Sequence, residues 1–206
     1  MEQHSQARDN LERRKILEAQ IRECFGRVVY SHKTHEKCAD ILLSRLSNIK
    51  LWQIILSAIT TAGFIATLFD TGKVGILIGI IVSTLLLILN AYTKNYDLGE
   101  IAQKHKQAAN DLWLIREKYL SLLTELAMGE KPTEDIKTVG DKPIDDIKKE
   151  RDVLLEDLHS IYSGSPSTTS KAYRKAQDAL KINEELTFSD EEIDAFLPKE
   201  LRKCRS

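Results

Sequence analysis

The chain of 206 residues carries 30 Lys and Arg against 31 Asp and Glu, which gives a formal net charge of −1. This balance excludes the broadly basic surface that nucleic-acid-binding proteins use, so no direct nucleic acid binding is expected. With only nine Gly and four Pro and 30% charged residues, the composition favours long helices and predicts an all-α fold. The odd number of cysteines, three, does not suggest a disulfide framework.

The first 50 residues are polar but have an apolar face that recurs in steps of three and four. Such spacing is typical of a helix that packs along a partner helix. The face is formed by Leu17, Ile21, Cys24, Val28, His35, Cys38, Leu42 and Ile49.

Two uncharged apolar runs follow, over residues 51–69 and 74–93, and only Asp70-Thr71-Gly72-Lys73 separates them. A helix rises about 1.5 Å per residue, so each run is long enough to cross a hydrocarbon core of ~30 Å. We therefore expect a membrane protein built on an antiparallel two-transmembrane helical hairpin. Neither run contains Asp, Glu, Lys, Arg or His, so a proton relay or a charged transport site is not expected.

Basic residues predict the orientation of the hairpin. They lie before the first run and after the second, whereas the short turn has only Lys73. The positive-inside rule then places both termini in the cytoplasm, and the aromatic rings of Trp52, Tyr92 and Tyr96 fall at the same interface. The flanking basic residues are Lys33, Lys37, Arg45, Lys50, Lys94, Lys104 and Lys106.

Small residues recur every four positions in both runs, which lets helix backbones approach closely in lipid. We expect these residues to form the packing face within the hairpin. They are Ala58, Ala62 and Ala66 in the first run and Gly75, Gly79 and Ser83 in the second.

Hydroxyl and amide side chains form a second polar set in the spans. Two helices cannot enclose a pore, but several copies could, with Thr60, Thr67, Thr84 and Asn90 as candidate pore-lining residues. The alternative is that the hydroxyls bond to carbonyls of their own helices and that Asn90 sits near the interface.

Beyond the second span, the same three- and four-residue steps continue over four heptads. No Gly or Pro occurs between Gly99 and Gly129, so we expect the second span and this stretch to form one nearly continuous helix. Paired with the N-terminal helix, it would form a cytoplasmic coiled-coil stalk about 50 Å long. Its apolar positions are Leu98, Ile101, His105, Ala108, Leu112, Ile115, Tyr119, Leu122 and Leu126.

Folding the hairpin about its turn pairs residues whose numbers sum to about 143, which places Cys38 opposite His105 with His32 and His35 nearby. We interpret His35, Cys38 and His105 as a polar layer in the stalk. A tetrahedral metal site is the alternative, but no CxxC pair accompanies these residues, and neither a metal nor a cofactor is predicted.

The sequence divides at residue 129 into the hairpin with its stalk, residues 1–129, and a C-terminal helical extension, residues 130–206. Residues 130–143 contain two of the prolines and indicate a linker, after which a helix from Ile144 is expected. The hydroxyl-rich stretch 163–170 precedes a helix expected to continue through Leu186, and Ser189 with Glu192 predicts a capping box for a last short helix. These helices are expected to pack on the stalk or dock a partner.

The hydroxyl-rich stretch, with Lys171 and Arg174 after it, has the composition of a phosphate-holding helix N-terminus, but a capped loop is the favoured interpretation. Elsewhere no phosphate-cradling loop, catalytic triad order or nucleophile elbow occurs, so the protein is not expected to be an enzyme.

Three segments together resemble the SLATT family of SMODS and SLOG-associating two-transmembrane effectors. They are Leu42-Leu-Ser-Arg-Leu-Ser-Asn-Ile-Lys50 before the hairpin, Asn90-Ala-Tyr-Thr-Lys-Asn-Tyr-Asp97 after it, and Glu185-Leu-Thr-Phe-Ser-Asp-Glu-Glu-Ile-Asp194 near the end. The resemblance implies a bacterial inner-membrane protein of an anti-phage conflict system. Such an effector is expected to form pores or disrupt the membrane and so to cause growth arrest or cell death.

The resemblance also implies partners: membrane lipid, further copies of the chain as a homo-oligomer, and a cytoplasmic sensor or an enzyme that synthesises nucleotide signals or nucleic acid, such as a reverse transcriptase. No fused sensor domain is apparent in this chain. The alternative function is a non-conducting membrane anchor or scaffold that recruits a cytoplasmic enzyme.

Overall fold

The computed structural model describes residues 2–67, 73–128, 143–189 and 192–193, with side chains described from residue 12 and not over 66–74. Five helices account for most of these ranges, and no strand occurs in them, which confirms the all-helical expectation for the described residues. The helices are α1 (Glu2–Thr67), α2 (Lys73–Asn95), α3 (Leu98–Met128), α4 (Ile144–Gly164) and α5 (Ser170–Lys181).

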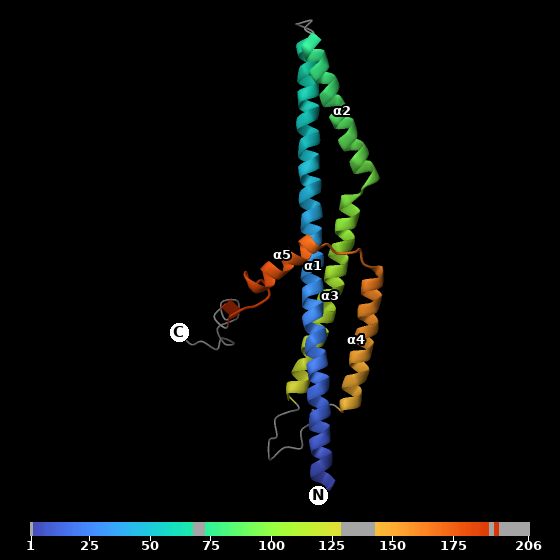
Figure 1. Cartoon of the computed structure of the whole chain (residues 1–206), viewed down its shortest axis with the longest axis vertical. Coiled ribbons are helices and arrows are strands. Elements are labelled where there is room, and N and C mark those ends of the chain that lie inside the picture. Colours follow the sequence, from blue (N-terminus) through green and yellow to red (C-terminus); the bar gives the residue numbers. More distant parts are fainter. Residues whose placement is uncertain (1, 68–72, 129–142, 190–191, 194–206) are drawn as a thin grey trace.

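Helix α1 is the axis of the molecule. It runs for 66 residues without interruption, which corresponds to about 100 Å at the helical rise. Helices α2 and α3 return along it in the opposite direction (Figure 1). Hydrogen bonds join the antiparallel helices, from Gln53 to Asn90 at the base of the hairpin and from His32 to the carbonyl of Ala109 further along the stalk.

The expected continuous helix after the second span is wrong in one respect, because the chain breaks between α2 and α3 at Tyr96 and Asp97. The Asp97 carboxylate accepts a hydrogen bond from the Glu100 amide at 2.8 Å and so caps the new helix. Gly99 leaves little room at this turn: a Cβ there would lie 3.2 Å from Asp97 Oδ1.

The core lies below the hairpin, where α1, α3 and α4 meet. Leu17 to Val28 of α1 pack against Leu112 to Leu126 of α3, and three residues of α4 close the third side. Most of the expected stalk positions are buried, but Ile101 is 37% exposed and Ala102 takes its place. The buried α4 residues are Ile147, Leu154 and Leu158.

Helices α4 and α5 both pack on the stalk rather than on each other. Helix α4 lies beside α3, and α5 crosses α1 near its middle (Figure 1). Thr169 caps α5 by accepting a hydrogen bond from the Ala172 amide at 3.2 Å, as the capped-loop interpretation predicts. The helix ends at Lys181, so Leu186, expected within it, lies beyond it.

The expected capping box is present after α5: the Ser189 amide donates to Glu192 Oε2 at 2.9 Å, and the Glu192 amide donates to Ser189 Oγ at 3.3 Å. Residues 129–142, Phe196, Leu197 and Cys204 lie outside the described residues. Cys24 and Cys38 are buried free thiols.

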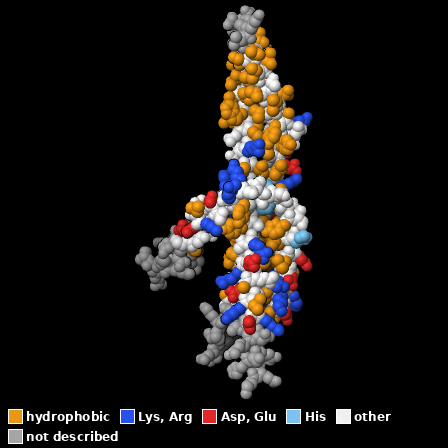
Figure 2. Space-filling view, in the orientation of Figure 1, with side chains coloured by type: hydrophobic (Ala, Val, Ile, Leu, Met, Phe, Trp, Pro, Cys, Tyr) orange, Lys and Arg blue, Asp and Glu red, His pale blue; other side chains and the backbone are white. Residues whose placement is uncertain are grey.

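The upper part of the molecule carries large apolar side chains on its surface, whereas charged side chains gather on the lower part (Figure 2). Ile54 is 67% exposed, Phe64 75% and Leu87 68%. Soluble monomers rarely expose a continuous apolar surface of this kind. The chain has two helices that are long and apolar enough to cross a membrane.

Candidate functional site

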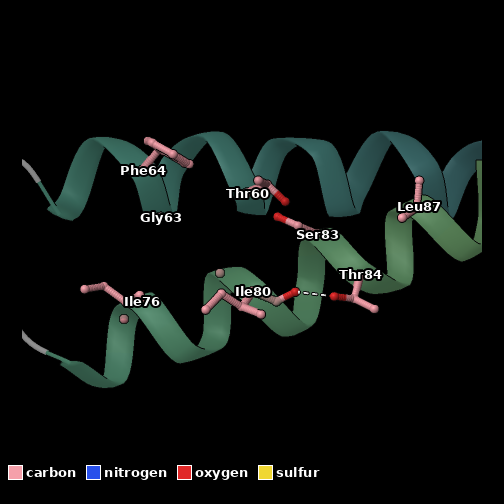
Figure 3. A pocket seen from close by; sticks show the side chains of 10 residues that line it. Thr60, Gly63, Phe64, Ile76, Ile80, Ser83, Thr84 and Leu87 are labelled. Carbon is pink, nitrogen blue, oxygen red and sulfur yellow. Dashed lines mark hydrogen bonds between the residues drawn. The ribbon is translucent and has the colours of Figure 1, made fainter.

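A groove of about 560 Å³ separates α1 from α2 within the apolar part of the molecule. Figure 3 shows Thr60 of α1 and Ser83 of α2 pointing toward one another across it. Its walls include Thr60, Gly63 and Phe64 from α1 and Gly75, Gly79, Ser83 and Thr84 from α2.

The glycines of the groove are not used for close packing within the chain. A Cβ added to Gly63, Gly75 or Gly79 would meet no atom within 4 Å. Gly75, Gly79 and Ser83, expected to pack in the hairpin, therefore line an open space.

The first-span residues of the expected packing face lie elsewhere. Ala58 and Ala62 are exposed and do not line the groove, and the side chain of Ala66 lies outside the described residues. The spacing of small residues alone did not identify Gly63 and Phe64 as the residues that face α2.

The candidate pore-lining residues occupy two environments. Thr84 Oγ1 donates to the Ile80 carbonyl at 2.8 Å (Figure 3), and Thr60 Oγ1 donates to the Leu56 carbonyl at 2.8 Å, so both hydroxyls bond within their own helices. Both threonines also line the groove. Asn90 lies lower, at the base of the hairpin, and the side chain of Thr67 is outside the described residues.

Polar and aromatic contacts join α1 to α2 at this base. Gln53 Nε2 donates to Asn90 Oδ1 at 2.8 Å and is 3.3 Å from Thr93 Oγ1. Nearer the stalk, the Arg45 guanidinium lies 5.6 Å from the centre of the Tyr92 ring, a cation–π contact. Gln53 was not among the predicted site residues, although a lone amide at the start of an apolar run is a visible signal.

The stalk contains a buried histidine layer. His35 Nδ1 and His105 Nδ1 are 2.9 Å apart, and His32 Nδ1 donates to the Ala109 carbonyl at 2.9 Å. Burial, with the neighbouring His105 and His32, lowers the pKa of His35 to about 4, and burial also lowers the pKa of His105. Cys38 is buried nearby on α1, and the described residues contain no cluster of three or more metal-ligating side chains.

A two-span apolar hairpin mounted on a helical stalk defines a two-transmembrane membrane protein, and the comparison with known families agrees. The model of the SMODS and SLOG-associating 2TM effector domain family 4 matches residues 17–192. The chain belongs to this family, which is a family of membrane effectors rather than of known enzymes. No curated protein and no solved structure matches the chain.

Proposed function

We propose that the protein is a homo-oligomeric membrane effector of a bacterial defence system, which forms a pore or disrupts the inner membrane and so causes growth arrest or cell death. The observation that carries the proposal is the open groove in the hairpin, where Gly63, Gly75 and Gly79 have no neighbour for an added Cβ.

Helices associate in lipid by close packing, because the hydrophobic effect does not drive apolar surfaces together there. Glycines favour such association only if another backbone comes close. In this hairpin they face open space, so we assign the groove to a transmembrane helix from a second copy of the chain.

Pore lining follows from the same assembly. Thr60 and Thr84 donate their protons to backbone carbonyls, yet each hydroxyl oxygen keeps acceptor capacity for water. A ring of copies would bring such oxygens together around a path, with Thr67 and Asn90 as further candidates.

The proposal also includes the orientation of the hairpin in the membrane and a cytoplasmic partner that activates it. We place both termini in the cytoplasm, because basic residues flank the spans on that side. An activating signal then arrives from a cytoplasmic sensor or from an enzyme that synthesises nucleotide signals or nucleic acid, through the stalk or the C-terminal extension, residues 130–206.

Bulky substitution in the groove tests the assembly. Gly79→Leu should fill the space for the second helix, so we expect it to lower the oligomeric state in nanodiscs and to reduce depolarisation of induced cells measured with a membrane-potential dye. Ala62→Leu adds the same side chain to an exposed position outside the groove and should change neither. If Gly79→Leu assembles and depolarises cells normally, the groove holds lipid rather than a helix, and the proposal fails.

The bonding of Thr60 and Thr84 within their own helices also fits the alternative of a non-conducting anchor that recruits a cytoplasmic enzyme. Dye leakage from liposomes separates the two functions. A pore should leak, and the pair Thr60→Leu and Thr84→Leu should weaken leakage while the oligomer persists. An anchor would not leak in any variant.

A further inference from the structure

The side-chain carboxylate of Glu185, which follows α5, lies between two lysines of the stalk. Glu185 Oε2 is 2.7 Å from Lys33 Nζ, and both carboxylate oxygens are 3.2 Å from Lys37 Nζ. Lys33 is only 8% exposed and also contacts Glu36 Oε2 at 2.8 Å. A buried lysine requires such partners, because an unpaired charge in this environment is costly.

The turn after α5 carries Glu185 to this position. Glu184 adopts a left-handed conformation with φ 51°, and the Glu185 amide donates back to the Ala179 carbonyl at 3.1 Å. The carboxylate is therefore presented by an ordered turn. Burial lowers the pKa of Lys33, but its hydrogen bonds to Glu185 and Glu36 outweigh this effect and raise it overall, while the hydrogen bond from Lys33 lowers the pKa of Glu185.

A cavity of about 440 Å³ lies beside this carboxylate. Lys106 and Asn110 of α3 line it together with the residues of the ion network. Both side chains are exposed, and within the described residues neither the Lys106 ammonium nor the Asn110 side-chain amide group is hydrogen-bonded to another side chain. The cavity thus contains donors that Glu185 does not use.

The charges around the cavity balance while Glu185 is in place and favour an anion once it leaves. Three lysines, Lys33, Lys37 and Lys106, line it with three carboxylates, those of Glu36, Asp40 and Glu185. If Glu185 leaves, the site has one positive charge in excess and Lys37 loses the carboxylate that it contacts. A phosphate group has more acceptor oxygens than a carboxylate and suits several ammonium donors at once.

We propose that this cavity binds a soluble phosphate-bearing molecule, for which Glu185 is the internal substitute in the unliganded protein, so that binding displaces the segment after α5 from the stalk. The proposal is independent of pore formation, because it concerns binding alone.

The position of the cavity distinguishes a soluble ligand from a lipid headgroup. Lys37 precedes the first span by 14 residues, which is about 20 Å along α1. The headgroup region adds only about 5–8 Å on each side of the hydrocarbon core. A phosphate of the surrounding bilayer therefore does not reach the site.

Titration of the full chain in phosphatidylcholine nanodiscs with inorganic pyrophosphate, followed by calorimetry, tests the proposal. Glu185→Gln weakens the internal competitor, so we expect about two- to fivefold tighter binding of pyrophosphate. Lys37→Met combined with Lys106→Met should weaken binding about tenfold or more. Asp157→Asn, which breaks the exposed Lys118–Asp157 pair, is the matched control and should leave the affinity unchanged.

Hydrogen exchange provides the second measurement. Pyrophosphate should speed exchange at the amides of Glu185 and Thr187, whose hydrogen bonds hold the turn. Nanodiscs that contain phosphatidylglycerol but no pyrophosphate should not speed this exchange. Faster exchange in them would show that the phosphate comes from lipid and would overturn the proposal of a soluble ligand. Equal pyrophosphate affinity in the wild type and Glu185→Gln, with unchanged exchange, would overturn the site itself. The side chain of Glu185 is partly exposed, so this variant is expected to fold even if the lysine pair does not.

Discussion

The imidazoles of His35 and His105 face each other with their Nδ1 atoms 2.9 Å apart, one from α1 and one from α3. At this separation one nitrogen must donate a proton and the other must accept it, so the two neutral rings carry opposite tautomers. The pair can share a single extra proton but cannot hold a charge on both rings. Because both rings are buried, a charge on either is disfavoured, and this layer joins the two stalk helices best when both rings are neutral.

Acid should destabilise the stalk. The pKa of His35 is lowered to about 4 in the folded chain from 6.5, so between these values the unfolded chain binds more protons than the folded chain. The contribution of His35 to the free energy of unfolding is present above pH 6.5 and declines as the pH falls through this window, by at most about 3–4 kcal/mol. Thermal unfolding in nanodiscs measures the decline.

The double substitution His35→Leu and His105→Leu should flatten this pH dependence. His159→Gln changes an exposed histidine of α4 and should leave it as in the wild type. A wild-type melting temperature that does not fall from pH 7 to pH 4 would contradict the assignment.

Tyr119→Phe should not destabilise the protein. Tyr119 is fully buried, and its hydroxyl lies beside the Cys24 thiol, a weak hydrogen-bonding group, without a well-formed hydrogen bond among the described residues. Removing an unsatisfied buried hydroxyl is neutral or raises the free energy of unfolding by up to about 1 kcal/mol. Tyr162→Phe is the contrast, because the Tyr162 hydroxyl donates to Ser31 Oγ at 2.8 Å. It should cost about 0.5–1.5 kcal/mol in the same denaturation experiment.

Asp97→Ala should weaken the start of α3. The substitution removes the acceptor for the Glu100 amide and should lower the free energy of unfolding by about 1 kcal/mol. Asp97→Asn keeps an oxygen in place and should retain most of the stability. Asp111→Ala, which loses only an exposed contact with Gln107 inside the same helix, should cost less than half as much. Equal losses for Asp97→Ala and Asp111→Ala would show that the cap does not stabilise α3.

Ile147→Ala should show that α4 is part of the stalk core. Ile147 is fully buried, and its truncation is expected to cost about 2–5 kcal/mol. Val153, 55% exposed on the same helix, should tolerate the same change within about 0.5 kcal/mol. Chemical denaturation followed by circular dichroism compares the two, and similar small losses would mean that α4 contributes little to the core.

Sequence periodicity predicted those parts of the fold that depend on local pattern. The hairpin over residues 51–93, the pairing of the His35 and His105 region and the start of α4 at Ile144 all follow from apolar spacing and helix-stop signals. The break at Asp97 had a local signal as well, because Asp97 with Glu100 forms a capping pattern. The apolar periodicity continues across residues 96 and 97, and it predicted an unbroken helix in spite of this capping pattern.

Other features depend on tertiary geometry that spacing does not encode. The rotation of α1 about its axis decides that Gly63 rather than Ala62 faces α2, and α1 shares this rotation with the stalk because it is one uninterrupted helix. The contact between Lys33 and Glu185 joins residues 152 positions apart through a turn with a left-handed residue. Neither feature has a recurrent pattern in the sequence.

The two legs of the hairpin differ in their continuity with the stalk. The α1 leg is a single rod from the core to the outer turn, whereas the opposite leg has a joint at Tyr96 and Asp97. Because Tyr96 and Asp97 lie outside both helices, a change in the angle between α2 and α3 would have to occur at these two residues. Such a change would alter the width of the groove between α1 and α2.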